Sequence, residues 1–282
     1  MILIADGGST KTTWCLVDAH SKRSFFHTEG YNPEFIGTAG IIASLQQNLP
    51  TTLVTTDVTE LHYYGASVVS PLQVATVANA MQAVFKTARV FVGHDLLAAA
   101  RALLGRRPGF AAILGTGTNS CVYDGKQITH NVDSLGYFLG DEGSGAFIGK
   151  QLLRDYLRGL MPTDLDAEFR TSYSLEREAI LDHLYNQPFP NRFVASFAKF
   201  AYDNHSSSYC QQVVKEAFEL FFRNIITKYS NYQAYTFNCV GSVGYNFRDA
   251  LTQVATAHGM TVGKIICAPI DDLVSYHLAE AS

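Results

Sequence analysis

Two glycine-rich segments of this 282-residue chain carry side chains suited to phosphate chemistry. The first reads Asp-Gly-Gly-Ser-Thr-Lys over residues 6–11, and the second reads Gly-Thr-Gly-Thr-Asn-Ser over residues 115–120. Each lies between two apolar runs, so each is predicted to be a hairpin turn. Glycine lets the backbone approach a ligand closely, and successive turn N–H groups can bind an anion. Either segment alone is typical of an ordinary turn, but the pair predicts two turns that hold one polyphosphate.

Carboxylates accompany both segments. Asp6 ends the first predicted strand and points toward the first turn, where a hydrated Mg²⁺ needs one or two carboxylates. Asp141 and Glu142 lie between glycines in Gly-Asp-Glu-Gly-Ser, residues 140–144, just before a predicted helix. Acidic residues at a helix start also interact favourably with its dipole. We expect Asp141 to approach the metal and phosphates, whereas Glu142 fits a structural role equally well.

Asp95 follows a very apolar strand, residues 89–93, and begins a helix. One interpretation is a helix N-cap. The other is a carboxylate at the carboxyl end of a central strand, where ligands of open α/β sheets bind. There it could accept the proton of an attacking hydroxyl, as the base of kinases does. The neighbouring His94 is interpreted as incidental.

A further turn, Gly-Ser-Val-Gly at residues 241–244, joins a strand to a helix. This arrangement is routine in α/β proteins. It also offers a flat surface without large side chains that could lie under an adenine or ribose.

Neither phosphate segment has the Gly-to-Lys-Ser/Thr spacing of a P-loop, and no helix follows directly as in the dinucleotide fingerprint.

The elements that must position these residues repeat once along the chain. In the first half we predict strands at 1–5, 12–18 and 21–30, a helix at 34–49, a strand at 61–67, a helix at 70–88, a strand at 89–93 and a helix at 94–105. In the second half we predict strands at 110–115, 118–125 and 126–131, a helix at 144–160, a strand at 235–241, a helix at 246–258, a strand at 263–269 and a helix at 271–281. The pattern predicts a duplicated α/β fold, and the alternative is one irregular α/β domain. The predicted domains are residues 1–107 and 108–282, with a helical insertion at about 163–230.

Composition narrows the possible classes of protein. Hydrophobic residues make up 47% of the chain, enough for a sizeable core, and the net charge of −4 argues against a nucleic-acid surface. No apolar run approaches the ~20 residues of a membrane span, and no signal peptide is evident. The five cysteines lack metal-ligand spacing, so we expect reduced thiols and a cytoplasmic location.

The segments ADGGSTKT, LGTGTNS, GDEGSGAFIG and VGSVG together resemble, in order and spacing, the phosphate and adenosine motifs of the actin-like ATPase superfamily. The closest resemblance is to the family of N-acetylglucosamine kinases and benzoyl-CoA-reductase-activator ATPases, over essentially the whole chain. It implies two ribonuclease-H-like domains around a cleft, with Mg·ATP across the cleft floor. It also implies that the helix at 271–281 packs back onto the N-terminal domain.

The resemblance assigns roles to individual residues. Asp6 would hold a Mg²⁺-bound water, Asp141 would lie near metal and sugar, and Asp95 would be the general base in contact with substrate. Asn32 resembles the asparagine that hydrogen-bonds sugar hydroxyls. The implied ATP-binding residues are Gly7, Gly8, Ser9, Thr10, Lys11, Gly115, Thr116, Gly117, Thr118, Gly241, Ser242 and Gly244.

The implied activity is transfer of the γ-phosphoryl group of Mg·ATP to a hydroxyl of an amino sugar. The sugar's identity stays open, because the Gly-Gly-Trp-Gly segment of N-acetylglucosamine kinases is replaced and Leu135 stands in place of the tryptophan. We expect no structural zinc and a homodimer, with the insertion either covering the nucleotide or forming the interface. The alternatives are an activator-type ATPase, whose relatives need cysteines for an iron–sulfur cluster, and a nucleotide-dependent sugar sensor.

Overall fold

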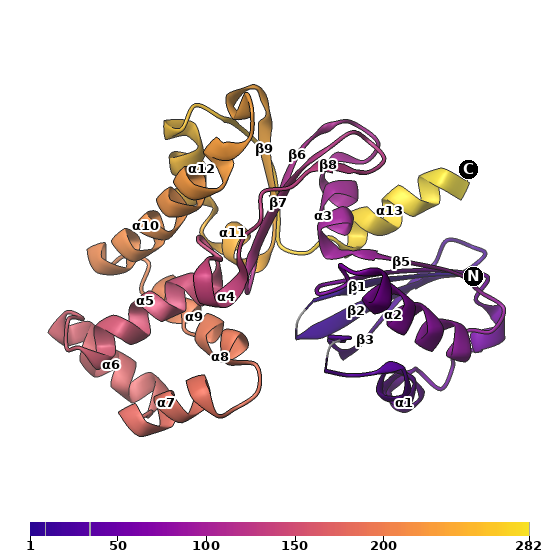
Figure 1. Cartoon of the computed structure of the whole chain (residues 1–282), viewed down its shortest axis with the longest axis horizontal. Helices are drawn as coiled ribbons and strands as arrows, with labels where there is room; N and C mark the ends of the chain where they lie inside the picture. The colour runs from indigo at the N-terminus through magenta and orange to yellow at the C-terminus, as the bar shows by residue number, and fades with distance from the viewer. Residues whose placement is uncertain (9, 34, 282) are drawn as a thin grey trace. The chain divides into compact units, whose positions relative to one another are not determined.

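The structure is a computed structural model that describes residues 1–8, 10–33 and 35–281, with side chains up to residue 279. The chain forms two compact units (Figure 1). Unit 1 contains Met1–Arg107, Gly125–Gln127 and the C-terminal segment that begins at Pro269. Unit 2 contains Pro108–Asp124 and Ile128–Ala268.

Unit 1 is built on a five-stranded sheet in the order β3-β2-β1-β4-β5. The strands are β1 (Ile2–Gly7), β2 (Lys11–Val17), β3 (Arg23–Glu29), β4 (Glu60–Gly65) and β5 (Arg89–His94). β1, β4 and β5 run parallel, while β2 and β3 form antiparallel hairpins beside β1. In this register Gly7 lies opposite Gly65, and Gly65 lies opposite His94. The carboxyl ends of the three parallel strands therefore meet at one edge of the sheet.

Helices cover both faces of this sheet. They are α1 (Thr38–Asn48), α2 (Pro71–Val84), α3 (Asp95–Leu104) and α13 (Ile270–Ala281), with a short 3₁₀ turn η1 (Thr55–Asp57). α1 and α2 bury the face that carries Leu3, Leu61 and Tyr63. α13 packs on α3 and β1, and its His277 contacts Tyr64, which points to the opposite face from Tyr63.

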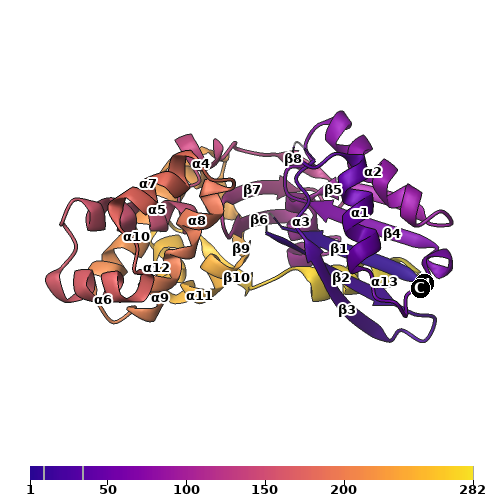
Figure 2. The same cartoon turned by 90° about the horizontal axis from the view of Figure 1, so that it is seen from below.

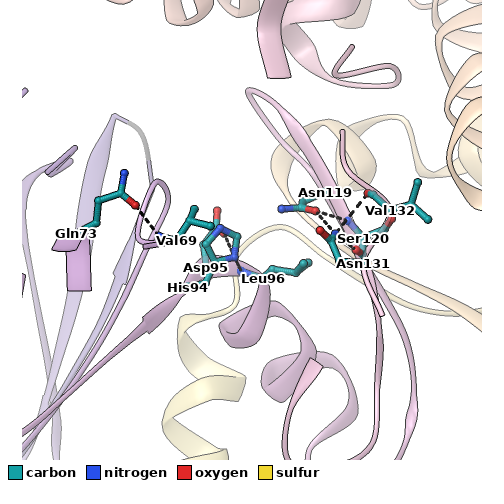
Figure 3. Close-up of polar contacts among 9 residues, drawn as sticks. All are labelled: Val69, Gln73, His94, Asp95, Leu96, Asn119, Ser120, Asn131 and Val132. Atoms are coloured by element: carbon teal, nitrogen blue, oxygen red, sulfur yellow. Dashed lines mark hydrogen bonds and ion pairs between the residues drawn. The ribbon is translucent and has the colours of Figure 1, made fainter. Parts of the chain in front are cut away.

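The start of α2 follows the sequence signal. Ser70 accepts the backbone N–H of Gln73, and Pro71 fills the first helical position. The Gln73 side chain accepts the N–H groups of Ser70 and Val69, and the bond to Val69 is drawn in Figure 3. This capping box satisfies backbone donors that have no partner inside the helix. It fixes where the connection from β4 enters α2.

Unit 2 repeats the strand order of unit 1. Its sheet runs β10-β9-β6-β7-β8, with β6, β9 and β10 parallel and β7 and β8 antiparallel. The strands are β6 (Gly109–Leu114), β7 (Thr118–Tyr123), β8 (Ile128–His130), β9 (Thr236–Val240) and β10 (Thr261–Ile266). The predicted α/β duplication is therefore confirmed, and the alternative of one irregular domain is wrong.

The helices of unit 2 include the predicted insertion, which holds α6 to α10. They are α4 (Gly136–Leu139), α5 (Gly145–Leu157), α6 (Thr163–Tyr173), α7 (Arg177–Tyr185), α8 (Pro190–Ser196), α9 (Ala198–Asp203), α10 (Ser208–Asn224), α11 (Ser242–Asn246) and α12 (Arg248–Ala257), with 3₁₀ turns η2 (Ile226–Lys228) and η3 (Tyr232–Ala234). α8 packs on α5 and α7, and α10 packs on α12 (Figure 2). Phe218, Phe221 and Phe222 of α10 lie in the core of the unit. Among the described residues, no helix has the length and apolar character needed to cross a membrane.

Candidate active site

The first glycine-rich segment forms the hairpin between β1 and β2. The Gly8 N–H donates to the Lys11 carbonyl at 3.0 Å and closes the turn. Gly7 is buried, and a Cβ there would lie 2.5 Å from the Tyr63 hydroxyl. Gly8, Thr10 and Lys11 are exposed. Packing against Tyr63 thus explains the glycine at position 7. At position 8 the exposed backbone, which has no side chain, is accessible to a ligand. The prediction for Ser9 lies outside the described residues.

Two carboxylates of unit 1 lie at the same sheet edge. Asp6 is near the end of β1, and Asp95 begins α3 directly after β5. Burial raises the pKa of Asp6 to about 7, with a further rise from the Asp95 charge and a smaller opposing effect of Lys11. Burial also raises the pKa of Asp95, opposed by His94 and the Leu96 N–H. Because the Asp95 charge disfavours ionisation of Asp6, a divalent cation beside Asp6 would relieve the repulsion, and Asp6 therefore fits a role at a Mg²⁺ site.

Replacing Asp6 by asparagine is expected to stabilise the folded chain, more at high pH than at low pH. The pKa is higher in the folded chain than the ordinary value of 3.8, so folding is penalised wherever the unfolded carboxyl is ionised. This penalty grows as the pH rises from about 4 to about 7 and is then constant, at roughly 2–4 kcal/mol. Urea denaturation at pH 5 and pH 8 in EDTA measures it. An equal gain at both pH values, or none, would contradict the electrostatic account.

Asp95 does not cap α3, so the N-cap interpretation of this residue is wrong. The N-cap is His94, whose Nδ1 accepts the Leu96 N–H at 3.2 Å (Figure 3). Asp95 is the first helical residue, and its Oδ1 lies 3.1 Å from His94 Nδ1. Its side chain is 25% exposed. Helix capping therefore does not explain the carboxylate at this position.

The second glycine-rich segment forms the hairpin between β6 and β7. The Gly115 N–H donates to the Gly117 carbonyl at 3.0 Å within the turn. The first N–H groups of α5 donate outward: Gly145 donates to the Gly115 carbonyl at 2.8 Å and Ala146 to the Thr116 carbonyl at 3.1 Å. The hairpin carbonyls are thus occupied by the start of α5, and the Gly-Asp-Glu-Gly-Ser segment is fixed to the hairpin.

Asp141 completes this connection in unit 2. It is buried, its backbone is left-handed at φ +59°, and its Oδ1 accepts the Thr118 N–H at 3.1 Å and the Thr118 hydroxyl at 3.5 Å. Burial raises the pKa of Asp141, while the Thr118 N–H, Ser134 and Lys150 oppose the rise. Lys150, which the sequence did not single out, donates to the Tyr137 carbonyl at 2.6 Å. The carboxylate is therefore held by the hairpin that was predicted to bind phosphate.

Substituting alanine at two glycines of this hairpin is expected to have opposite outcomes. A Cβ at Gly117 would lie 2.9 Å from Asp141 Oδ2, whereas a Cβ at Gly115 would have nothing within 4 Å. Gly117→Ala should therefore displace the carboxylate and cost about 1–3 kcal/mol, and Gly115→Ala should stay within about 1 kcal/mol of the wild type. Chemical denaturation of both variants compares them directly. Equal costs would show that Asp141 does not pack on the hairpin in this way.

A network of amides fixes the segment that leads to Asp141. Asn131 Nδ2 donates to Asn119 Oδ1 at 2.9 Å and to the Ser120 carbonyl at 2.7 Å (Figure 3). The Ser120 N–H also donates to Asn119 Oδ1, at 2.9 Å. Asn119 belongs to the glycine-rich segment itself. Glu142, next to Asp141, accepts the amide of Asn224 at 2.8 Å, which is a structural contact.

Packing explains the glycines of the predicted adenosine turn. Gly241 has φ +129°, and a Cβ there would collide with the Leu114 carbonyl. A Cβ at Gly244 would lie 2.6 Å from Cys239 Sγ. Both glycines let α11 approach β6 and β9, and Ser242 between them is exposed. Contact of this turn with an adenosine stays a prediction.

A groove of about 1030 Å³ lies in unit 2 between α9–α10 and α11–α12. It begins at Asn246, Phe247 and Arg248, just after the predicted adenosine turn, although the glycines of that turn do not line it. Phe247 meets Tyr202 edge to face, with ring centroids 6.0 Å apart. Aromatic and polar groups thus share one concave surface, as small-molecule sites do.

Asn32, the predicted sugar-binding residue, lies in the loop between β3 and α1. Its carbonyl accepts the N–H groups of Phe35 and Ile36, at 3.0 and 2.9 Å, and the residue is half-buried. The turn places Asn32 just beyond Tyr31, which is buried against the core of unit 1. The structure therefore leaves Asn32 partly accessible in unit 1.

Solved structures resemble this chain over its whole length. A candidate N-acetylglucosamine kinase from Porphyromonas gingivalis is 34% identical, with 100% of both chains covered and a TM-score of 0.95. A candidate N-acetylglucosamine kinase from Chromobacterium violaceum is 16% identical, with 98% of both chains covered and a TM-score of 0.69. A ROK family glucokinase from Streptomyces griseus, in complex with glucose and AMPPNP, is 13% identical, covers 100% of this chain and 99% of its own, and has a TM-score of 0.56.

The last two similarities show the shared fold alone. No protein-family model and no curated protein matches the sequence. The first similarity is of another kind, because it joins 34% identity to full coverage of both chains. It confirms the resemblance to N-acetylglucosamine kinases that the glycine-rich motifs indicated. The chain belongs to the N-acetylglucosamine kinase family, sugar kinases with the actin-like ATPase fold.

Proposed function

We propose that the protein transfers the γ-phosphoryl group of Mg·ATP to a hydroxyl of an amino sugar, N-acetylglucosamine or a relative. The observation that carries this proposal is the pair Asp6 and Asp95 at the carboxyl edge of the unit 1 sheet. Burial and the Asp95 charge raise the pKa of Asp6, so negative charge is unfavourable at this edge without a cation. A base and a metal-binding carboxylate at one edge are what phosphoryl transfer to a hydroxyl requires. The name of the Porphyromonas gingivalis protein supports the class of acceptor.

Asp95 is the proposed general base. In the reaction the acceptor O–H bond breaks and its proton moves to the Asp95 carboxylate. The acceptor oxygen bonds to the γ-phosphorus, and the bond from that phosphorus to the bridging oxygen breaks, so that its electron pair leaves with ADP. The raised pKa of Asp95 favours this proton transfer, because a carboxylate disfavoured in its charged form is a stronger base.

The proposed phosphate contacts come from both glycine-rich hairpins. In unit 1 the exposed Thr10 and Lys11 supply a hydroxyl and a positive charge, and the exposed Gly8 has no side chain to keep a phosphate from the backbone. In unit 2 the residues proposed are Gly115, Thr116, Gly117 and Thr118, with Ser242 under the nucleoside. Bound Mg²⁺, held through Asp6 and Asp141, would neutralise phosphate charge. We propose that the adenine ring of ATP enters the groove at Asn246 and Phe247.

The acceptor is proposed to contact Asn32 and Asp95. In this chain Leu135 replaces the tryptophan of N-acetylglucosamine kinases, and it is 59% exposed. The sugar must therefore be recognised without a tryptophan contact. An amino sugar related to N-acetylglucosamine fits this departure as well as N-acetylglucosamine itself. The proposal therefore names the class and leaves the member to experiment.

The test is a panel of acceptors. Hexoses, N-acetylhexosamines and N-acetylmuramate are each incubated with the protein and Mg·ATP, and ADP release is followed. One amino sugar that raises ADP release far above the rate without acceptor supports the proposal. Equal ADP release with and without every acceptor would indicate an ATPase instead and overturn it.

The cysteines favour the kinase over the activator-type ATPase. Cys15, Cys121 and Cys210 are buried, and burial raises the pKa of their thiols to about 11, 12 and 11. Cys239 is also buried, with its pKa raised. Iron–sulfur clusters are held by cysteine thiolates, and burial disfavours the thiolate at these four residues. The homodimer and the cytoplasmic location stay predictions.

A further inference from the structure

The groove of unit 2, where the adenine ring is proposed to enter, has an apolar floor. Its floor consists of the buried residues that line it, and these are Ala201, Cys210, Val214 and Val254. Burial raises the pKa of the Cys210 thiol to about 11, so this group is uncharged near neutral pH. A thiol is only a weak hydrogen-bond donor. The floor can therefore shield a ring from water but offers it little hydrogen bonding.

The polar side chains lie along the rim of the groove. Among the described lining residues, every polar one is exposed except Glu219, which is half-buried and contacts His258 at 2.9 Å. The exposed set includes Tyr202, Gln211, Lys215, Asn246 and Arg248. An exposed polar group is hydrated when no ligand contacts it, so it loses little when a ligand offers no matching atom. The rim can therefore add hydrogen bonds to a ligand without rejecting a ligand that lacks them.

The size of the groove imposes little selection either. Its volume is about 1030 Å³, and pockets of roughly 300–1,000 Å³ already bury most of a drug-sized ligand. A nucleobase is smaller than such a ligand. Purines and pyrimidines therefore both fit between the wall formed by α9 and α10 and the wall formed by α11 and α12.

Recognition of one nucleobase requires contacts that this groove does not offer. Adenine carries an amino donor at the position where guanine carries a carbonyl acceptor. A site rejects such an analogue by about 10⁴-fold when its buried polar groups are left unpaired. Every nucleobase has a π-face, in contrast, and stacking on an aromatic ring tolerates all of them. Phe247, which is half-buried and meets Tyr202 edge to face, offers such a ring.

We infer that the protein accepts nucleoside triphosphates with little regard to their nucleobase, so that Mg·GTP is a phosphoryl donor as well as Mg·ATP. This inference rests on the proposed kinase function and deepens it. With GTP the acceptor oxygen bonds to the γ-phosphorus, the bond from that phosphorus to the bridging oxygen breaks, and its electron pair leaves with GDP. The acceptor proton moves to Asp95 as before. The nucleobase takes no part in this step and affects only nucleotide binding.

The wild-type protein provides the main test. The amino sugar found with the acceptor panel is incubated with Mg·ATP, Mg·GTP or Mg·UTP, and the sugar phosphate is quantified. The kcat/KM with GTP and with UTP should lie within about 30-fold of that with ATP, since weak contacts discriminate on this scale. A larger preference for ATP would overturn the inference.

Two variants separate stacking on the ring from contact with the nucleobase edge. Phe247→Leu keeps an apolar side chain but removes the ring, so the KM for ATP and for GTP should rise by a similar factor of about 5 or more. A loss confined to one nucleotide, or no loss, would overturn the inference. Asn246→Ala removes an exposed amide of the rim, and the ratio of kcat/KM for ATP to that for GTP should change less than about threefold. A larger change would show that the nucleobase edge is read. The tests with the wild type and Asn246→Ala do not depend on the folding of Phe247→Leu.

Nucleotide binding can be measured without turnover. Calorimetric titrations of the wild-type protein with Mg·ATP and Mg·GTP, in the absence of acceptor, should give Kd values within about 30-fold of each other. If they do and no sugar is phosphorylated, the proposed function fails while the inference about the nucleobase stands. If ATP supports sugar phosphorylation and GTP neither binds nor donates, the inference fails while the proposed function stands. Lack of binding by both nucleotides would overturn both.

Discussion

Replacing Asp95 by asparagine is expected to lower kcat for sugar phosphorylation by roughly 10²-fold or more, the scale of general-base assistance. The asparagine amide cannot take the hydroxyl proton, while its size and polarity are close to those of aspartate. In the described part of the chain, Asp95 contacts His94 and the Leu96 N–H and not the glycine-rich hairpins, so the affinity for ATP should stay within about twofold of the wild type. The loss should therefore appear in kcat and not in nucleotide binding.

Steady-state rates and calorimetric ATP titrations of the purified variant measure both quantities. Asp57→Asn is the matched control, because Asp57 is an exposed carboxylate of unit 1 outside the site and should leave kcat unchanged. Asp95→Asn also removes a like charge beside Asp6, so the pKa of Asp6 should fall from about 7. Retained turnover in Asp95→Asn would remove this residue from the mechanism.

Replacing Asp6 by asparagine is expected to lower kcat/KM for Mg·ATP by about 10²-fold, since loss of metal positioning costs several kcal/mol. The expected signature lies in the metal dependence. In the wild type Mg²⁺ should strengthen ATP binding, and in Asp6→Asn this difference should shrink, because one of two proposed metal carboxylates is absent. ATP titrations with and without Mg²⁺ compare the two proteins.

The same variant supplies its own control for folding. Asp6→Asn should be more stable than the wild type at pH 8, because the costly carboxylate is gone. A variant that is more stable yet less active would show that Asp6 is retained for function at the expense of stability. A full Mg²⁺ effect on ATP binding in Asp6→Asn would contradict its assignment to the metal.

Local patterns predicted the order of the elements well and their ends less well. The strands predicted at 1–5 and 12–18 extend to Gly7 and from Lys11, so that only three residues remain for the turn. Pairing with β2 and β4 carries β1 through its glycine, an example of tertiary context overriding propensity. The helix predicted over 34–49 begins only at Thr38, because the Asn32 carbonyl first closes a turn.

The candidate site was predictable in its polar residues and not in their supports. Glycine-rich turns and carboxylates at strand ends are visible in sequence. The Tyr63 hydroxyl beneath Gly7 comes from another strand, and Lys150 reaches the Tyr137 carbonyl from inside α5. His94 was interpreted as incidental because a lone histidine gives no sequence signal. Such contacts depend on three-dimensional packing, which local spacing does not encode.

Transfer of a labelled γ-phosphoryl group from Mg·ATP to an amino sugar is the direct test of the proposed kinase activity. The protein is incubated with γ-labelled ATP and each amino sugar, and the products are separated and analysed by mass spectrometry. We expect the label to appear in one sugar phosphate with the wild type and with Asp57→Asn, and to appear at least about 10²-fold more slowly with Asp95→Asn. Label found only in inorganic phosphate, whatever sugar is present, would contradict it.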